Sequence, residues 1–385
     1  MQALILGGTG TMGQAAARDL IKQEQVKKVI LGDIITDPSK LHDKLRTSEK
    51  VSLSRIDVND HEGLVRAIKG IDVVINCVGP FHKTGVTVAR AAIEARVNYI
   101  DISDEYKTVT HLFVPEIGNA AKEAGITILT GMGSDPGTSN VIAKYYANQL
   151  DRVDEIAFFW AVSIADLEEG ATWGAAWDHS LHMNTGKIPQ YLDGKLEYVQ
   201  AGTGEETVKF FEPLGTCQVH YVGHPQPLTV PRYIEGVKTV VIKGGLLPPW
   251  VDQLIKEQNE SGFLSMEPLE VKGTKVAPYD LTLRLWRTIL NNRDRGAIAS
   301  GIKVIVRGER KGKQVTYTSD MVGRTAPGTG IAASIAALML CSGDIKVKGV
   351  VAPEGCIDPE KYFAALLKRN AKIHQTETIT STLGL

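Results

Sequence analysis

Apolar and polar positions along the first third of the chain follow two repeating spacings. Short apolar runs, each followed by a longer segment with apolar residues at helical spacing, are typical of βαβ units. The runs predict six strands, namely Ala3–Leu6, Lys28–Gly32, Val51–Asp57, Asp72–Val78, Tyr99–Ile102 and Ile126–Thr130. Helical spacing at Gly13–Gln23 and Val86–Ala95 predicts two of the intervening helices. Because helical crossovers join parallel strands, we expect a Rossmann-type, doubly wound parallel sheet in an α/β protein.

The pattern changes after Asp135-Pro136-Gly137. A helical segment is followed by β-like runs between glycine and proline clusters, and these are Ser139–Gln149, then Glu155–Val162, Lys238–Ile242 and Lys303–Arg307. We therefore expect a second α+β domain with a mostly antiparallel sheet. Near the end, Gly328–Leu340 predicts a helix of small residues, Pro359–Lys368 predicts an amphipathic helix, and Thr376–Leu385 is expected to be a polar tail.

Length and composition fit a soluble two-domain protein that binds a small molecule. The chain has 385 residues, 43% of them hydrophobic and 23% charged. Its 43 basic and 44 acidic residues nearly cancel, so no overall field favours nucleic acid or an anionic membrane. No apolar run approaches the roughly 20 residues of a membrane span. The glycine-rich turn follows Met1 within a few residues, so we expect no secretory leader and a cytoplasmic protein.

The cysteines do not suggest a structural role. The four are Cys77, Cys217, Cys341 and Cys356. They lie far apart without a Cys-x-x-Cys pair, so we expect neither a disulfide framework nor a structural zinc site. A reducing compartment fits this usage.

A glycine-rich turn connects the first predicted strand to the first helix. Its residues are Gly8, Thr9, Gly10, Thr11, Met12 and Gly13. Glycines let backbone N–H groups approach a pyrophosphate, and the helix N-terminus adds a favourable partial charge. The glycines alone are weak evidence, but Asp33 ends the second strand 20 residues after Gly13. Strand, turn, helix and carboxylate together predict a nicotinamide dinucleotide site.

Asp33 favours NAD, with NADP as the less favoured cofactor. A carboxylate at this place accepts hydrogen bonds from the ribose 2′-OH and repels a 2′-phosphate. The alternative is a solvated aspartate that opens the next loop.

Two further strand ends are candidates for the cofactor site. Asp57 either lies near the adenine or caps the following helix. The turn Val78-Gly79-Pro80 follows the fourth strand at the carboxyl edge of the sheet, where it would face the ribose and nicotinamide, unless it is a simple Gly-Pro turn.

These segments together resemble the saccharopine dehydrogenase-like oxidoreductases. The resemblance rests on the glycine turn and on further segments, which are Gly79-Pro80-Phe81, Tyr99-Ile100-Asp101-Ile102-Ser103, Ala124-Gly125-Ile126-Thr127-Ile128, Gly133-Ser134-Asp135-Pro136-Gly137 with Asn140, and Lys348–Glu354. It is specific over residues 1 to about 145 and faint across the middle.

The resemblance implies a discontinuous dinucleotide-binding domain. Residues 1–137 would be completed by residues 326–385, and residues 138–325 would bind substrate and form a homodimer or higher homo-oligomer. The implied reaction is hydride transfer at a C–N bond of a lysine-like amino acid or its saccharopine-type conjugate. Where some reductases of the family carry a cysteine, this chain has Phe159-Trp160-Ala161, which leaves the substrate open.

Asp135 is the leading candidate for a catalytic acid-base group. Hydride leaves a carbon only when the attached nitrogen is unprotonated, so a base must accept the ammonium proton. Asp135 matches the family's Asp-Pro-Gly acid, although it can also be read as a turn residue before a proline. Asp104 is the second candidate. With Ser103 and Glu105 it either holds a substrate ammonium or caps the helix that starts near Tyr106.

Other side chains are candidates for the substrate pocket. Trp177 and His179, in the run Trp173–His182, either wall it or occupy core or surface positions. Two histidines and one aspartate in this run fall short of a metal set, so we expect no metal there. Arg324 is an arginine suited to a substrate carboxylate, as are Arg287, Arg293 and Arg295, and the alternative for each is a surface position.

A different class of protein also fits the N-terminus. Gly7-Gly8-Thr9-Gly10 is similar to the opening of NmrA-like proteins, some of which bind dinucleotide as redox sensors without turnover. The Asp-Pro-Gly segment and the long β-rich second half favour an enzyme.

Overall fold

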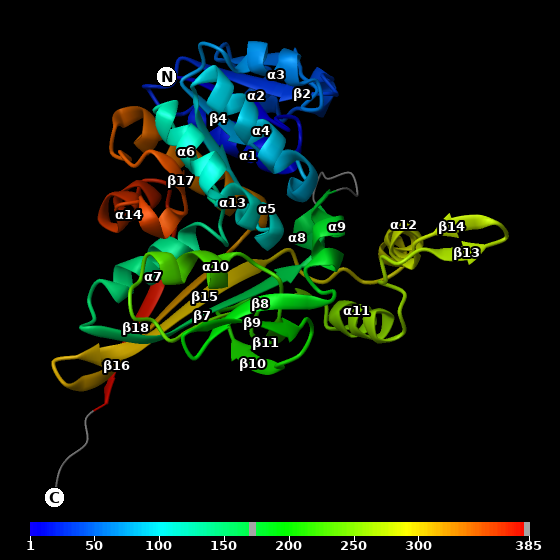
Figure 1. The fold of residues 1–385 in the computed structure, drawn as a ribbon, viewed down its shortest axis with the longest axis vertical. Helices are drawn as coiled ribbons and strands as arrows, with labels where there is room; N and C mark the ends of the chain where they lie inside the picture. The colour runs from blue at the N-terminus through cyan, green and yellow to red at the C-terminus, as the bar shows by residue number, and fades with distance from the viewer. Residues whose placement is uncertain (169–174, 381–385) are drawn as a thin grey trace, which may run out of the picture.

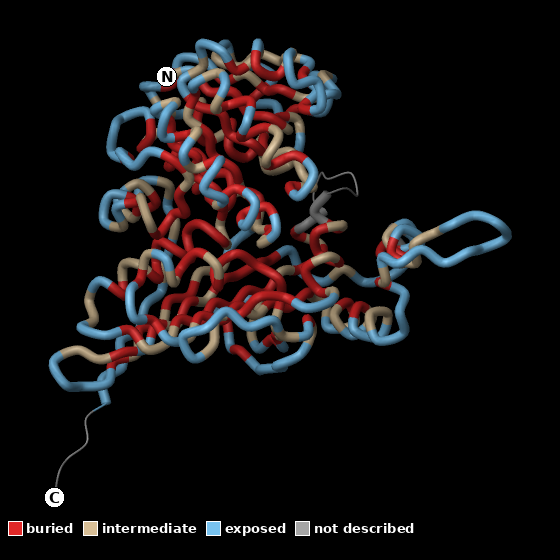
Figure 2. Tube along the Cα trace, viewed as in Figure 1, coloured by how far each residue is buried: buried red, intermediate tan, exposed pale blue. Residues whose placement is uncertain are grey.

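The computed structural model describes residues 1–168 and 175–380. Two sheets lie one above the other in Figure 1, with helices around the first and the N-terminus at its far end. Figure 2 shows a continuous buried interior through both.

The first sheet has seven parallel strands in the order β17-β6-β5-β4-β1-β2-β3. They are β1 (Gln2–Leu6), β2 (Lys28–Asp33), β3 (Val51–Arg55), β4 (Val73–Asn76), β5 (Asn98–Asp101), β6 (Thr127–Leu129) and β17 (Gly349–Val351). The six predicted strands are confirmed, with shorter ends in the third, fourth and sixth. β4 ends at Asn76 because the Asn76 side chain accepts the Val78 N–H, which turns the chain out of the sheet.

Helices cover both faces of this sheet. They are α1 (Thr11–Leu20), α2 (Asp43–Arg46), α3 (His61–Ile68), α4 (Phe81–Ala95), α5 (Tyr106–Leu112), α6 (Pro115–Glu123), α13 (Thr325–Ser342) and α14 (Pro359–Leu367). On one face, Ala16 and Leu20 of α1 pack with α13 over Ile5. On the other, Leu64 of α3 and Val88 of α4 belong to a separate core. This doubly wound arrangement places loops at the carboxyl ends of the strands.

α13 lies directly against α1. A Cβ added at Gly330 would lie 2.5 Å from the carbonyl carbon of Ala15, so the contact is between backbones. This close approach explains the run of small residues. By length and composition α13 could cross a membrane, and 61% of its 18-residue window is buried inside the structure.

The second sheet has nine strands, ordered β10-β11-β12-β7-β15-β16-β18, with β8 paired to β12 and β9. They are β7 (Arg152–Ser163), β8 (Lys187–Leu192), β9 (Lys195–Gln200), β10 (Glu206–Lys209), β11 (Thr216–Tyr221), β12 (Thr239–Leu247), β15 (Ser300–Arg310), β16 (Lys313–Gly323) and β18 (His374–Thr380). β12 and β7 are parallel and the other pairs antiparallel, which confirms the mostly antiparallel second domain.

Helices and one further hairpin complete this part of the chain. They are α7 (Thr138–Ala147), α8 (Ile164–Glu168), α9 (Ala175–His182), α10 (Gln226–Thr229), α11 (Trp250–Glu260), α12 (Pro278–Asn291) and the hairpin β13 (Leu269–Val271) with β14 (Thr274–Val276). The hairpin and α12 project from the body and the hairpin is largely exposed (Figures 1 and 2).

The expected polar tail is wrong over its first half. Residues 374–380 form β18, which pairs antiparallel with β16 from Gln314↔Thr380 to Asp320↔His374. Every residue of β18 is exposed, so backbone hydrogen bonds rather than burial hold the strand, and a hydropathy pattern gives no sign of it. Residues 381–385 lie outside the described residues.

Candidate active site

The glycine turn is packed tightly at two glycines and open at a third. A Cβ at Gly13 would lie 2.4 Å from Gly7 O, and one at Gly8 would lie 2.7 Å from the Leu31 Cα. At Gly10 the nearest atom would be Gly7 O, at 3.3 Å. Gly10 is also the N-cap of α1 and provides no side-chain cap. The first N–H groups of α1 are therefore open to an anion, which fits a pyrophosphate.

Asp33 faces this turn. The backbone N–H and the hydroxyl of Thr9 donate to Asp33 Oδ2 at 3.2 and 2.6 Å. The carboxylate therefore lies where the ribose of a dinucleotide on the turn would lie. Asp57 is exposed and accepts the Asn59 N–H at 2.9 Å, so its carboxylate serves a local turn, and the cap of α3 is Asp60.

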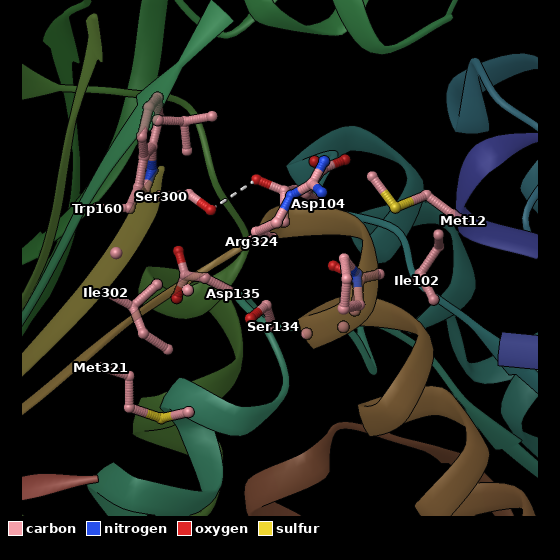
Figure 3. A pocket seen from close by; sticks show the side chains of 18 of the residues that line it. Met12, Ile102, Asp104, Ser134, Asp135, Trp160, Ser300, Ile302, Met321 and Arg324 are labelled. Carbon is pink, nitrogen blue, oxygen red and sulfur yellow. Dashed lines mark hydrogen bonds between the residues drawn. The ribbon is translucent and has the colours of Figure 1, made fainter. Parts of the chain in front are cut away.

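A pocket of about 510 Å³ lies between the two sheets. In Figure 3, Trp160, Ile302 and Met321 lie on one side, Met12 and Ile102 lie on the other, and Asp135 lies between them. Gly79 and Pro80 also line it, so the glycine turn and the fourth-strand turn meet at its edge. The nicotinamide of a dinucleotide bound at the glycine turn would enter this pocket.

Asp135 is held by hydrogen bonds to one of its two oxygens. The Ser139 hydroxyl and the Gln226 amide donate to Oδ1, the latter at 2.8 Å. Oδ2 is buried, has no hydrogen-bond partner among the described residues, and lies 3.6 Å from His224 Nδ1. Burial raises the pKa of Asp135 to about 7, against the lowering effect of these two donors. One oxygen is thus fixed, and the other is available to a proton near neutral pH.

Asp104 and His179 form a second titratable pair in the same pocket. Asp104 Oδ2 lies 3.1 Å from His179 Nε2. Burial alone would raise the pKa of Asp104, but His179 and His224 lower it overall. Burial likewise opposes the charged form of His179, but Asp104 raises its pKa overall. Burial lowers the pKa of His224 to about 4, so this ring is neutral at physiological pH.

Glu105 and Ser103 have structural partners. Glu105 accepts the backbone N–H groups of Phe81 and His82, at 3.1 and 2.8 Å, so it binds the N-terminus of α4. The alternative that Glu105 caps the helix near Tyr106 is wrong: Glu105 is the N-cap residue of α5 but makes no side-chain cap bond there. Ser103 is fully buried, and its hydroxyl accepts the Glu105 N–H.

Arg324 enters the pocket from the start of α13. Its Nε donates to Asp166 Oδ1 at 3.1 Å, and Asp166 is buried. Asp166 also accepts the Thr325 N–H at 2.6 Å and the Ser300 hydroxyl at 2.8 Å. The arginine is therefore oriented by a carboxylate that joins α8, β15 and α13.

The remaining candidates divide between pocket and core. His179 lines the pocket, whereas Trp177 packs on Trp286 at 4.8 Å between ring centroids, in the core of the second domain. Trp173 lies outside the described residues. Sequence reasoning missed His224, Gln226 and Asp166. Each is an isolated polar residue in the weakly patterned middle of the chain, and no motif marks it.

Two family models match the chain. The saccharopine dehydrogenase NADP-binding domain matches residues 3–129, and the saccharopine dehydrogenase C-terminal domain matches residues 133–372. The chain belongs to the saccharopine dehydrogenase family. It is an oxidoreductase of that family with a nicotinamide dinucleotide site, and the first model's description names NADP.

Relatives span nearly the whole chain. Carboxynorspermidine synthase of Vibrio cholerae is 26% identical, covering 91% of this chain and 87% of the relative. Carboxyaminopropylagmatine dehydrogenase of Synechocystis is 19% identical, covering 97% of this chain and 98% of the relative. Apo saccharopine dehydrogenase (L-Glu forming) from Saccharomyces cerevisiae shares the fold, with a TM-score of 0.71 at 16% identity over 99% of this chain.

Proposed function

We propose that this protein is a dehydrogenase that transfers a hydride at the C–N bond of a carboxylated amine, either a saccharopine-type conjugate or a lysine-like amino acid. One observation carries the proposal. A buried carboxylate whose pKa is raised to about 7, Asp135, presents a free oxygen to a pocket that adjoins the glycine turn. The names of the two relatives favour a conjugate over a free amino acid.

The pocket side chains fit the proton transfers that this reaction needs. A bound nicotinamide would exchange the hydride with the substrate carbon. Asp135 Oδ2 accepts the proton of the substrate ammonium, because this oxygen has no hydrogen-bond partner among the described residues. Ser139 and Gln226 hold the other oxygen, which fixes the direction of the carboxylate. His224 stays neutral beside it and adds no competing cation.

The charges in the pocket match a substrate that carries both signs. Asp104 and Asp135 attract an ammonium group. The arginine and the lysine that line the described pocket, Arg324 and Lys372, are the groups that attract a carboxylate. Arg324 offers its planar guanidinium to a carboxylate while Asp166 orients it. Amino-acid conjugates have this combination of charges.

We infer that NAD is the preferred cofactor. Asp33 would accept the ribose 2′-OH, and a 2′-phosphate would meet its negative charge. Thr9 holds the carboxylate at the turn, so it cannot move far to admit a phosphate.

A cofactor-absorbance screen tests the proposed reaction. Saccharopine, lysine, diaminopimelate and carboxylated polyamines are each offered with NAD and NADP, and matching amine and aldehyde pairs are offered with the reduced cofactors. We expect turnover with at least one carboxylated conjugate. Tight dinucleotide binding without turnover of any of these compounds would instead favour the redox-sensor alternative.

A further inference from the structure

Three side chains from separate parts of the chain converge at one side of the pocket. Asp104 follows β5, His179 belongs to α9, and His224 lies between β11 and α10. One oxygen and two ring nitrogens, one ligand atom from each residue, all lie within 4.8 Å of one another. All three residues line the same pocket, so a solute that enters it can reach them.

The two histidines are buried with ring nitrogens that lack hydrogen bonds. His179 is 8% exposed and His224 is 3% exposed. Among the described residues, His179 Nδ1 and His224 Nδ1 make no hydrogen bond and lie 3.8 Å from Glu105 Oε1 and 3.6 Å from Asp135 Oδ2, while His179 Nε2 lies 3.1 Å from Asp104 Oδ2, its ion-pair partner. Buried polar atoms without partners are rare because each costs about 1–3 kcal/mol. Ring nitrogens that lie beside carboxylates at the edge of a pocket suit a bound cation.

We propose that Asp104, His179 and His224 bind one divalent transition-metal ion, with Zn²⁺ the best match. Two imidazoles and one carboxylate form the donor set of an open zinc site, with the fourth position left to water or substrate. Zinc donors at about 2.0–2.2 Å from the ion lie nearer together than 4.8 Å, so the side chains draw inward on binding.

No motif in the sequence marks this set. From the sequence we expected no metal, because Asp178, His179 and His182 within one short run fall short of a metal set, whereas the converging donors come from three distant segments. His182 instead lies 3.1 Å from Lys107 Nζ, outside the cluster.

The ion would occupy the place that the proposed function gives to the substrate ammonium. This consequence rests on that function, but metal binding itself does not. Zn²⁺ therefore acts as an inhibitor that competes with the amine and not with the dinucleotide.

Cobalt binding tests the site without any substrate. Co²⁺ is titrated into the purified protein and followed by its visible absorption, and Zn²⁺ is then added to displace it, with calorimetry for stoichiometry. We expect one ion per chain and a low-coordinate Co²⁺ spectrum. His224→Gln and Asp104→Asn should each weaken binding by at least about tenfold, because each removes one of three donors.

The matched control is His220→Gln. His220 is also a partly buried histidine of the second domain, but it contacts Asn184 Oδ1 at 2.7 Å and does not line the pocket. Thermal melts and dinucleotide binding establish that each variant is folded. Absence of a one-to-one Co²⁺ complex, or a complex that folded His224→Gln and Asp104→Asn variants retain at wild-type affinity, would overturn the proposal.

Activity separates this proposal from the proposed function. Competitive inhibition by Zn²⁺ against the amine, reversed by EDTA, supports both. Stoichiometric Co²⁺ binding that depends on the three residues, in a protein that reduces no dinucleotide with any amine, supports the metal site and contradicts the proposed function.

Discussion

Asp135 is the side chain on which the chemistry most depends. Asp135→Asn keeps the shape and the bonds to its neighbours but removes the base, since an amide does not accept a proton near neutral pH. We expect the turnover number to fall by roughly 100- to 10,000-fold, the usual contribution of general acid-base catalysis, with affinity for the dinucleotide within a few-fold. Steady-state kinetics and calorimetry measure the two effects. A folded Asp135→Asn variant with more than about a third of the wild-type turnover number would contradict the assignment of Asp135 as the catalytic base.

The raised pKa of Asp135 also sets a pH dependence. Catalysis needs the deprotonated carboxylate, so the wild-type acidic limb of kcat/KM should lie near pH 7 and disappear in Asp135→Asn. For stability, the native state holds this proton more tightly than the unfolded chain. The contribution of Asp135 to the free energy of unfolding therefore falls as pH rises from about 4 to about 7. The Tm of Asp135→Asn relative to wild type should accordingly increase from about pH 5 to about pH 8; a constant difference would show that burial does not raise this pKa.

Asp33 carries the expected cofactor preference. NADP should bind more weakly than NAD by on the order of 1–3 kcal/mol, because its 2′-phosphate meets a carboxylate instead of a basic side chain. Calorimetry with both cofactors measures this directly. Asp33→Ser should reduce the difference in affinity between NAD and NADP. Equal affinities for the two cofactors in the wild type would contradict the predicted preference.

Single residues differ in whether the sequence predicts their place at the candidate site. Asp135 stands in a motif beside a strand end, so its place at the pocket was predictable. Glu105 was a candidate for substrate, yet its carboxylate binds the N-terminus of α4, because only the fold shows which helix begins nearby. His224 and Gln226 reach Asp135 across about 90 residues of chain, a distance that no local pattern spans.

At the level of elements, the packing of the turn between β1 and α1 predicts that substitutions at its glycines differ in their effects on dinucleotide binding and on stability. Gly10→Val should abolish dinucleotide binding in a folded protein, because a Cβ there comes no closer than 3.3 Å to the chain but lies where the pyrophosphate would. The control is Gly13→Val, whose Cβ would lie 2.4 Å from Gly7 O and should lower the Tm. Circular dichroism and calorimetry distinguish the two. Unchanged affinity of Gly10→Val for the dinucleotide would show that the turn is not part of the cofactor site.

Elements with a buried face were predictable and exposed ones were not. The strands of the first sheet are apolar on both faces because helices cover both, and their runs stand out in the sequence. β13, β14 and β18 are almost wholly exposed, so their pairing depends on backbone hydrogen bonds and on turns. β13 and β14 have three residues each, too few to establish a period, and β18 is almost entirely polar, so the hydrophobic pattern does not reveal these strands.

On the scale of the whole molecule, the chain passes between the two sheets three times. It leaves the first after β6, returns at α13 and leaves again before β18. The family resemblance, not the hydropathy pattern, supplied the expectation that the end of the chain completes the first domain. A periodicity shows that a segment is a helix but not which distant helix it meets.

This connectivity predicts that residues 1–137 do not fold alone. Without α13 and β17, the face of α1 at Ala15 and Ala16 and the edge of β6 lose their cover. We expect the isolated fragment to aggregate or to lack a cooperative thermal transition, and co-expression with residues 325–385 to restore part of its solubility. A cooperative melt of the fragment by itself would contradict this.

The contact of α13 with α1 therefore also orders events during biosynthesis. The glycine turn leaves the ribosome before the second domain, but the helix that packs behind it is translated only after most of that domain. Until then a nascent chain exposes the alanine face of α1. The dinucleotide site is thus begun before the second domain is made and finished only after most of that domain has been translated.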